Sequence, residues 1–314
     1  MVAISLWHTD PATSALKSAS LTQEPQDLIL DATYSLVSLG TEKIVLTGMV
    51  PPELYTVMKV PYMGGSFSFP VKYGYSLVGS SADQGNYHVM HPHQDKVSVR
   101  LQDAFKLPAS LPLNRAALIS NLETACNAYW DGRAAQDEPI LIVGFGLIGA
   151  AIALWHKLLG HQSITVIEKN DHRRALAQGL GFETLTQPIP DQKFSLAFHC
   201  SATGLGLQTC IDHMDFEGRI IELSWYGDKP VSLHLGHYFH YNRLSIISSQ
   251  VSHIPDRLQA TQNYLTRKQA VVNMLQHDIW DQLIGIEVPF HQIIPWYDRL
   301  RSGQLNEISL LIKY

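Results

Sequence analysis

The sequence predicts an α/β protein with two domains, a β-barrel-like domain and a doubly wound sheet of six parallel strands. Residues 28–107 hold short β-rich runs separated by glycine- and proline-rich loops, which is typical of a small barrel. The middle of the chain alternates β-rich runs with helical segments, an order that builds a parallel sheet. One crossover of this part carries a glycine-spaced turn, Gly144-x-Gly146-x-x-Gly149, between a β-rich run and a helix.

Composition limits the classes of protein that this chain can be. Its 314 residues, 46% apolar and 16% charged, suffice for two ordinary domains with a substantial core. The net charge of −5 gives no reason to expect a nucleic-acid partner. The N-terminus lacks the regions of a secretory signal, and the apolar stretch at 140–159 is too interrupted for a membrane span. Three cysteines without CxxC spacing fit a reducing compartment, so we expect a cytoplasmic protein with no membrane partner.

The β-barrel-like domain is predicted from five β-rich runs, which are 28–38, 69–79, 86–90, 96–101 and 104–107. A long loop at 50–69, rich in Pro, Gly and Met, separates the first two runs, and such loops are often functional. Short β-runs return at 285–314, together with a helix near 292–302 that Gly303 ends. We therefore expect this domain to comprise residues 1–120 and 280–314.

The doubly wound domain is predicted to comprise residues 121–279. A helix that begins near residue 115 leads into it, and a helical segment at 256–278 leads out of it. Its six β-rich runs are 140–143, 163–167, 182–185, 194–199, 219–224 and 244–249. Helices connect most of these runs, as in a full doubly wound sheet.

The glycine-spaced turn predicts a dinucleotide-binding crossover. Gly144 permits the tight turn out of the strand, and Gly146 lacks the Cβ that would keep a diphosphate from the backbone. Gly149 lets the helix pack close to the sheet. At the start of that helix, the backbone N–H groups of Leu147 and Ile148 are expected to face the phosphates. A parallel crossover whose glycines serve only packing is the alternative.

An acidic residue, Glu168, ends the next β-rich run, 19 residues after the third glycine. It can accept hydrogen bonds from the hydroxyls of the adenosine ribose, and its charge opposes a 2′-phosphate. NAD(H) is therefore favoured. Lys169, His172 and Arg173 follow directly and could neutralise a 2′-phosphate, so NADP(H) stays an alternative.

The loops after the later strands supply further candidates for cofactor contacts. In an open α/β sheet the ligand lies at the carboxyl ends of the strands. The side chains that this rule selects for the ribose or the carboxamide are Ser201, Thr203, Ser224 and Gln250. Ordinary loop capping is the alternative for each of them.

Several segments resemble the medium-chain dehydrogenase/reductase superfamily. The run 38–42 (SLGTE) is similar to its Cys-Gly-Thr-Asp segment, and 73–76 (YGYS) is similar to its Gly-His-Glu segment. The runs 91–95 (HPHQD), 122–131 (LETACNAYWD) and 222–233 (ELSWYGDKPVSL) resemble a bacterial zinc-type alcohol dehydrogenase-like branch, related to bacteriochlorophyllide side-chain dehydrogenase. The resemblance covers nearly the whole chain. It implies a GroES-like catalytic domain, a Rossmann domain and a nicotinamide cofactor.

The same resemblance argues against a catalytic zinc. That zinc needs a thiolate, an imidazole and a third Cys or Glu ligand. The thiolate position falls on Leu39 or Ser38, the imidazole position on Tyr75, and the third on Ser120 or Asn121. The four cysteines of the structural-zinc lobe are absent from residues 80–120 as well. We therefore expect zinc-independent chemistry and no metal site.

Histidines offer the main alternative to this expectation. His91 and His93 could form a relocated metal site, and His234, His237 and His240 follow i, i+3, i+6 spacing. Without nearby Cys or acidic partners in the sequence, surface or hydrogen-bonded histidines are the simpler interpretation.

Without a metal, hydride transfer needs a hydrogen-bond donor close to the substrate oxygen. The resemblance makes Tyr75 the first catalytic candidate, with Thr41 in support, and a space-filling role for Tyr75 is the alternative. The residues expected at the substrate cleft are Tyr73, His91, Glu123 and Trp225. An aromatic lining would suit a flat or hydrophobic substrate. Glu123 alternatively pairs with an arginine.

These observations predict a zinc-independent NAD(P)-dependent oxidoreductase acting on an alcohol/carbonyl pair or on an enone- or quinone-type substrate. Relatives lead us to expect a homodimer, formed through the β-run at 244–249. A catalytically inactive NAD(P)(H)-binding or sensing protein of the same fold is one alternative. A metalloenzyme that uses His91 and His93 is the other.

Overall fold

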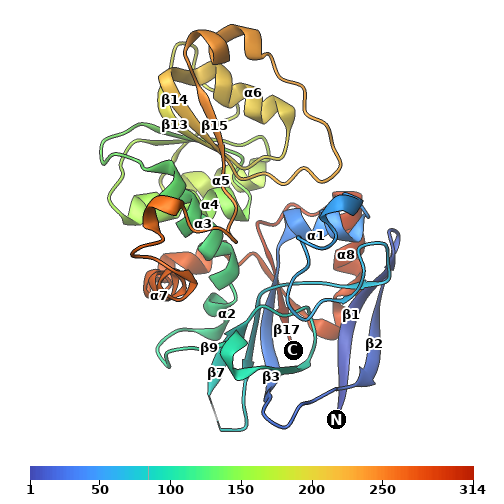
Figure 1. Ribbon diagram of the computed structural model, residues 1–314. Coiled ribbons are helices and arrows are strands. Elements are labelled where there is room, and N and C mark those ends of the chain that lie inside the picture. Colours follow the sequence, from blue (N-terminus) through green and yellow to red (C-terminus); the bar gives the residue numbers. More distant parts are fainter. Residues whose placement is uncertain (84) are drawn as a thin grey trace. The chain divides into compact units, whose positions relative to one another are not determined.

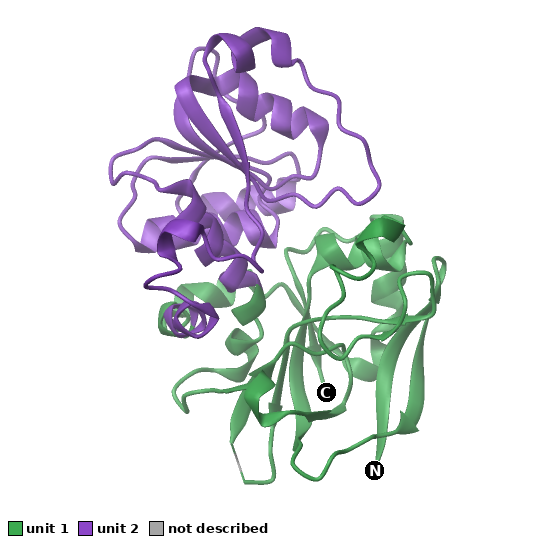
Figure 2. Ribbon diagram, in the orientation of Figure 1, with its two compact units in different colours: residues 1–120, 272–314 green, residues 121–271 purple. Residues whose placement is uncertain are grey.

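The computed structural model describes residues 1–83 and 85–314. The chain divides into two compact units (Figure 2), one of residues 1–120 with 272–314 and one of residues 121–271. The first unit is therefore assembled from the two ends of the chain, and the second is continuous. Among the described residues, no helix combines the length and the apolar character needed to cross a membrane.

The first unit contains a four-stranded sheet in the order β2-β1-β5-β4. Its strands are β1 (Val2–Asp10), β2 (Thr13–Ser20), β4 (Gly64–Gly65) and β5 (Val71–Lys72). The antiparallel hairpin of β1 and β2 lies in a segment for which the sequence predicts no strand. The start of β1 alternates, with Ala3 and Ser5 buried and Val2 and Ile4 exposed, whereas Leu6 and His8 are buried on the opposite face.

The second sheet of this unit has the order β16-β17-β3-β6-β7-β9, and β8 also pairs with β3. Its strands are β3 (Leu28–Val37), β6 (Leu77–Ser80), β7 (Asn86–Val89), β8 (Lys96–Val99), β9 (Ala104–Lys106), β16 (Ile286–Pro289) and β17 (Leu310–Lys313). The C-terminal strand β17 lies between β16 and β3, and Figure 1 labels β17 and β3 in this unit. The predicted single strand at 69–79 is wrong, because Gly74 has a φ of +122° and interrupts it between β5 and β6.

Helices complete the first unit. They are α1 (Leu39–Leu46), α2 (Leu113–Ala116) and α8 (Ile294–Ser302), with 3₁₀ turns at Pro52–Leu54, Leu101–Asp103, Asp278–Leu283 and Phe290–Gln292. Helix α8 ends at Gly303, which has a φ of +74°, as the sequence predicts. Buried Leu46 of α1 and Tyr297 of α8 share one hydrophobic core with Val37 and Leu310.

The second unit contains a six-stranded sheet in the order β12-β11-β10-β13-β14-β15, parallel throughout. Its strands are β10 (Ile140–Val143), β11 (Ile164–Ile167), β12 (Glu183–Leu185), β13 (Phe194–His199), β14 (Met214–Glu222) and β15 (Ser245–Ser248). Numbered within the unit, this order is 3-2-1-4-5-6, the doubly wound Rossmann order. The predicted six-stranded parallel sheet is confirmed, and its topological switch point lies between β10 and β13.

The helices of this part are α3 (Ile119–Gly132), α4 (Leu147–Leu158), α5 (Asp171–Gly179), α6 (Gly204–His213) and α7 (Tyr264–Met274), with a π turn at Leu235–Phe239 and a 3₁₀ turn at Asp256–Leu258. Helix α6 packs on β10, β13 and β14. The helix predicted at 256–278 is shorter in the structure. Asn263 and Thr266 exchange backbone-to-side-chain hydrogen bonds there and cap the first turn of α7.

Candidate functional site

The glycine-spaced turn joins the fully buried strand β10 to helix α4. Gly144 has a φ of +95°, and a Cβ there would lie 2.8 Å from the backbone N of Ser201. A Cβ on Gly149 would lie 1.9 Å from the carbonyl oxygen of Gly144. These two glycines are required by the fold itself, as the sequence predicts for a close helix-to-strand crossover.

Gly146 differs from the other two glycines. The nearest atom to a Cβ built on it is Nη1 of Arg173, at 3.6 Å, so the space over this residue is open. Gly146 is the N-cap of α4, and no side chain caps the helix. The first-turn N–H groups, including those of Leu147 and Ile148, therefore need an external acceptor. An open backbone, a helix N-terminus and an adjacent guanidinium are the features that bind a phosphate.

Glu168 follows β11 and ties two loops together. One carboxylate oxygen accepts from the backbone N of Phe145 at 2.7 Å, and the other accepts from the backbone N of Asn170 at 2.8 Å. Each oxygen keeps capacity for another donor, such as a ribose hydroxyl. Asn170 caps α5 by accepting from the backbone N of Arg173, and Lys169 is exposed. One anion and at least one cation thus stand beside the glycine-spaced turn.

A second polar cluster lies at the carboxyl ends of β13 and β14. His199 and Glu222 end these strands and are direct partners in the parallel register. Nδ1 of His199 lies 2.8 Å from Oε2 of Glu222, and its Nε2 lies 2.7 Å from Oγ of Ser201. Ser224 accepts from the backbone N of Ala202 at 3.0 Å. Sequence reasoning named the two serines but missed the buried histidine and its carboxylate.

Tyr226 completes this cluster by donating to Oε2 of Glu222 at 3.1 Å. Burial and the neighbouring Glu222 carboxylate raise the pKa of the Tyr226 phenol, which keeps its proton. Thr203 caps α6 by accepting from the backbone N of Gly206 at 3.0 Å. The predicted contact residue Gln250 follows β15, and its Oε1 accepts from the backbone N and the hydroxyl of Ser252 in the same turn.

In the first unit, the link between β5 and β6 carries Tyr73, Gly74 and Tyr75. Tyr73 is buried, and its ring meets the half-buried Tyr75 edge-on, with centroids 6.1 Å apart. Ser120 donates to the carbonyl oxygen of Tyr75 at 2.8 Å. Thr41 is half-buried in α1. Both catalytic candidates therefore belong to this unit.

A buried hydrogen-bonded pair, Glu42 and His93, lies beside this link, and sequence reasoning did not select it. Nε2 of His93 lies 3.1 Å from Oε2 of Glu42, and both side chains are almost fully buried. Tyr297 donates to the same carboxylate at 2.6 Å, and Ser38 donates its backbone N–H at 2.9 Å. Burial alone would raise the pKa of Glu42, but His93 and these hydrogen bonds lower it below its ordinary value. The carboxylate is therefore charged at neutral pH.

The histidine pair at 91 and 93 does not present two free nitrogen ligands to one point. His93 uses Nε2 for Glu42 and Nδ1 for Ser35, at 2.7 Å. His91 is buried and stacked on Tyr62, and its Nδ1 is 2.8 Å from the carbonyl oxygen of Pro92. Burial lowers the pKa of His91 to about 3. His91 is therefore a neutral imidazole that packs on Tyr62 and contacts the carbonyl oxygen of Pro92.

The residues that the sequence resemblance aligns with zinc ligands carry groups that this metal rarely binds. Ser76 stands beside the imidazole position, and its Oγ donates to the carbonyl oxygen of Ala117 at 2.7 Å. Ser38, Tyr75 and Ser120 offer hydroxyls where zinc prefers thiolate and imidazole. Across residues 1–83 and 85–314, no three His, Cys, Asp or Glu side chains are grouped as metal ligands.

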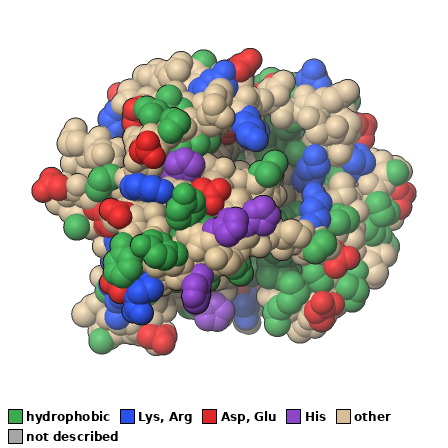
Figure 3. All heavy atoms as spheres, turned by 90° about the horizontal axis from the view of Figure 1, so that it is seen from above, with side chains coloured by type: hydrophobic (Ala, Val, Ile, Leu, Met, Phe, Trp, Pro, Cys, Tyr) green, Lys and Arg blue, Asp and Glu red, His purple; other side chains and the backbone are tan. Residues whose placement is uncertain are grey.

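Histidines are nevertheless prominent on the surface. Figure 3 shows several of them exposed on one face, among scattered basic and acidic side chains. His234, His237 and His240 are all exposed, and the rings of the first two have centroids 5.9 Å apart. This spacing brings two imidazoles together at the π turn.

Two further cleft candidates, Glu123 and Trp225, belong to the second unit. Glu123 is buried on α3, where one oxygen lies 3.4 Å from Nε of Arg267 and the other 3.4 Å from Nζ of Lys268. This is the arginine pairing that the sequence left as an alternative. Trp225 is half-buried in the loop after β14, beside Tyr226.

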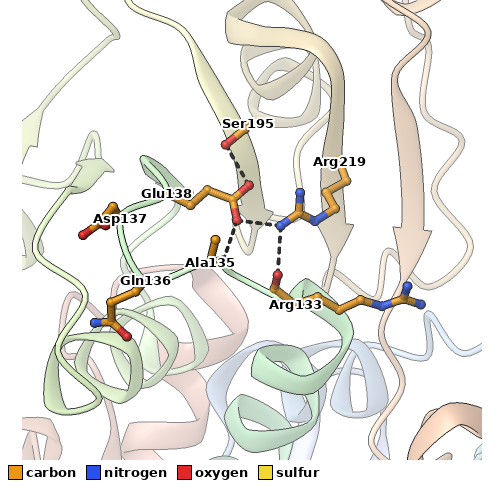
Figure 4. Close-up of a pocket in the computed structure, with 7 residues that line it drawn as sticks. All are labelled: Arg133, Ala135, Gln136, Asp137, Glu138, Ser195 and Arg219. Carbon is orange, nitrogen blue, oxygen red and sulfur yellow. Dashed lines mark hydrogen bonds and ion pairs between the residues drawn. The ribbon is translucent and has the colours of Figure 1, made fainter.

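A hollow of about 780 Å³ lies in the second unit, at the amino ends of the strands of its parallel sheet. The glycine-spaced turn and the His199–Glu222 cluster lie at the carboxyl ends of these strands. In Figure 4, Glu138 points toward Ser195 and Arg219, which come from β13 and β14. Its carboxylate takes hydrogen bonds from Ser195 at 2.7 Å, from Arg219 at 2.6 Å and from the backbone N of Ala135 at 2.9 Å. These polar groups satisfy one another, and ligands of doubly wound sheets bind at the carboxyl edge. The hollow is therefore separate from the candidate cofactor site.

The known proteins that this chain resembles are named as dehydrogenases. No family model matches the sequence. The chain is 25% identical over 174 residues to 2-dehydro-3-deoxy-L-galactonate 5-dehydrogenase of Pseudoalteromonas atlantica, which covers 52% of this chain and 50% of that protein. The chain thus spans about half the length of this curated relative.

Solved structures match over the entire chain. 2R,3R-butanediol dehydrogenase of Bacillus subtilis has a TM-score of 0.79 at 14% identity, covering 100% of both chains. A short chain alcohol dehydrogenase of E. coli CFT073, complexed with NADH, has a TM-score of 0.76 at 14% identity, covering 100% of this chain and 99% of that one. These likenesses confirm the predicted fold class, a GroES-like β-barrel domain and a Rossmann domain. The narrower bacterial branch named from the sequence stays a prediction.

Proposed function

We propose that the protein is an NAD(P)-dependent oxidoreductase that transfers hydride between a nicotinamide and a small alcohol or carbonyl compound without zinc. The observation that carries this proposal is the open backbone at Gly146, which stands at an uncapped helix N-terminus next to Glu168 and Arg173. The dehydrogenase names of the curated and structural relatives support it. Those names favour an alcohol/carbonyl pair over an enone or quinone.

In this proposal the residues of the chain have distinct tasks. The N–H groups at the start of α4 bind the diphosphate, and Glu168 accepts from the adenosine ribose, which favours NAD(H). When bound, the nicotinamide supplies or accepts the hydride. Tyr75 donates a hydrogen bond to the substrate oxygen, with Thr41 in support. Tyr73, His91 and Trp225 are proposed to shape the substrate site.

The setting and assembly are part of the same proposal. The three cysteines form no disulfide, which supports a reducing cytoplasm. Strand β15 ends the parallel sheet and exposes part of Ile247, so its free edge supports a homodimer formed by pairing two copies. Sedimentation velocity measures that assembly directly.

Replacement of Gly146 by Ala tests the cofactor site. The added Cβ meets no protein atom within 3.5 Å and should leave the fold intact, but it would stand where a diphosphate must approach. We expect wild-type protein to bind NADH more tightly than NADPH by calorimetry, and Gly146→Ala to lose at least tenfold in affinity for both. Gly179→Ala, at a position of α5 with equally open space, is the matched control. Equal NADH affinity of the Gly146 variant and wild type would refute the site.

A second candidate function is an NAD(P)(H)-binding or sensing protein without turnover. What favours it is that the resemblance aligns Leu39 or Ser38 with the thiolate position and Tyr75 with the imidazole position of the superfamily's zinc site. Deuterium-labelled NADH separates the two functions. Transfer of the label to any member of a carbonyl panel supports the oxidoreductase, and binding without transfer supports the sensor.

A further inference from the structure

Glu222, His199 and Ser201 form a series of hydrogen bonds, and the donors around Glu222 indicate which atom donates in each of them. Glu222 also accepts from the backbone N of Ser224 at 2.7 Å and from the Tyr226 hydroxyl at 3.1 Å, so it acts as an ionised carboxylate acceptor. The shortest contact of His199 Nδ1 is the 2.8 Å to this carboxylate. The hydroxyls of Ser224 and Tyr226 lie farther from it, at 3.3 Å. Nδ1 must therefore carry the proton that is donated to Glu222.

The tautomer of His199 then determines what Ser201 can offer. A neutral imidazole protonated at Nδ1 has a lone pair at Nε2, which can only accept. With the imidazole in this neutral form, the Ser201 hydroxyl, 2.7 Å away, donates its single hydrogen to His199. Thr203, 3.0 Å from Ser201, already accepts from the backbone N of Gly206 and can donate its own hydrogen to Ser201. One lone pair of Ser201 is left for an outside donor.

The surroundings of this lone pair favour a ligand over a packing role. His199 is fully buried, but Ser201 is half-buried and stands at the carboxyl end of β13, next to the topological switch point. Burying a carboxylate and an imidazole costs free energy, and apolar side chains would fill the same space without that cost. A purely packing role therefore does not explain these two residues. Their arrangement determines whether the hydroxyl of the half-buried Ser201 donates or accepts a hydrogen bond.

We propose that Glu222 and His199 are positioning residues that hold Ser201 as a hydrogen-bond acceptor for the nicotinamide half of the dinucleotide. This inference rests on the proposed cofactor binding. The donors available on that half are the ribose hydroxyls and the carboxamide NH₂. A ligand that offers an acceptor to Ser201 instead would be disfavoured.

Isosteric substitution of Glu222 by Gln separates polarity from packing. The amide NH₂ of Gln can donate to Nδ1 of His199, which moves the imidazole proton to Nε2. Ser201 would then accept from His199 and turn its own hydrogen toward the ligand. We expect Glu222→Gln and Ser201→Ala each to weaken NADH binding by about three- to tenfold, the value of one hydrogen bond. The ¹⁵N shifts of His199 should report the exchanged tautomer in Glu222→Gln.

Three ligands keep the outcomes distinct. ADP lacks the nicotinamide half, ADP-ribose adds the second ribose, and NADH adds the carboxamide. The variants should bind ADP as wild type does. A loss that begins with ADP-ribose identifies a ribose donor, and a loss seen with NADH alone identifies the carboxamide, and either one supports the inference. Ser195→Ala, which removes a serine hydroxyl from a carboxylate at the other end of β13, is the matched control and should bind all three normally.

Two results would overturn the inference while the proposed function stands. One is wild-type NADH affinity in Ser201→Ala, and the other is an equal loss of ADP and NADH affinity in Glu222→Gln. Wild-type protein that binds neither ADP nor NADH would overturn both the proposed function and this inference.

Discussion

The backbone of Tyr75 is fixed by contacts that do not involve its hydroxyl. Gly74 turns the chain with a φ of +122°, and Ser120 donates to the carbonyl oxygen of Tyr75 at 2.8 Å. The neighbouring Tyr73 ring packs edge-on against it. A half-buried phenol with a fixed backbone suits a donor that must meet a developing oxyanion without reorganisation.

Removal of this hydroxyl should affect the chemical step more than cofactor binding. We expect Tyr75→Phe to lower kcat about 100-fold or more on any alcohol or carbonyl compound that wild type turns over, with NADH affinity unchanged. Steady-state kinetics and calorimetry measure the two quantities. Tyr87→Phe, at a buried tyrosine of the same unit, is the control for loss of a phenol. Full activity of Tyr75→Phe would assign Tyr75 the space-filling role.

Single residues differ in how visible they are in the sequence. The role of Gly149 follows from local spacing, because a Cβ there would meet the carbonyl oxygen of Gly144, whereas the close approach of Gly144 to Ser201 joins parts of the chain that are far apart in sequence. The pairs Glu42–His93 and His199–Glu222 depend on side chains that are far apart in the chain. The second pair could have been found from strand alignment, since both residues end neighbouring parallel strands. The first has no such local signal.

Elements of the second unit follow the sequence closely, and those of the first do so less well. Alternating β-rich runs and helices define the Rossmann sheet, because strands such as β10 and β11 are short, fully buried runs. The hairpin β1–β2 escaped prediction because its strands are only partly buried and β2 consists largely of Ala and Ser. Helix α1 escaped because Gly40 and Thr41 in its first turn are weak helix formers.

The link between β5 and β6 should be sensitive to one methyl group. A Cβ on Gly74 would lie 2.8 Å from Nε2 of His93, in a backbone conformation that side chains rarely adopt. We expect Gly74→Ala to destabilise the first unit by roughly 2 kcal/mol or more and to disturb the Glu42–His93 pair. Hydrogen exchange of peptides from α1 and β17 measures this, with peptides of the second unit as internal reference.

Gly40→Ala is the matched substitution for that experiment. Gly40 lies in the first turn of α1 with no atom within 4 Å of an added Cβ, so Ala there should be neutral or stabilising by about 0.5 kcal/mol. Equal exchange in both variants would show that Gly74 has no special conformational role.

Across the whole molecule, three buried histidines oppose protonation. Burial lowers the pKa of His8 to about 4, that of His91 to about 3 and that of His156 to about 4, from an ordinary value of 6.5. In each case the unfolded chain binds the proton first as the pH falls. The contribution of these three histidines to the free energy of unfolding is therefore fully present above pH 6.5, and it is lost as the pH falls toward 4. Two of these groups belong to the first unit and one to the second.

The free energy of unfolding should fall less steeply with decreasing pH when one of these histidines is removed. His91→Asn keeps an N–H that can donate to the carbonyl oxygen of Pro92, and it no longer titrates. Between pH 6.5 and 4 the variant should lose less stability than wild type by on the order of 3 kcal/mol, at about 1.4 kcal/mol per pH unit and proton. Differential scanning calorimetry at stepped pH measures the difference, and His291→Asn at an exposed position is the matched control. Parallel curves for wild type and His91→Asn would mean that His91 takes up its proton equally in the folded and unfolded chains.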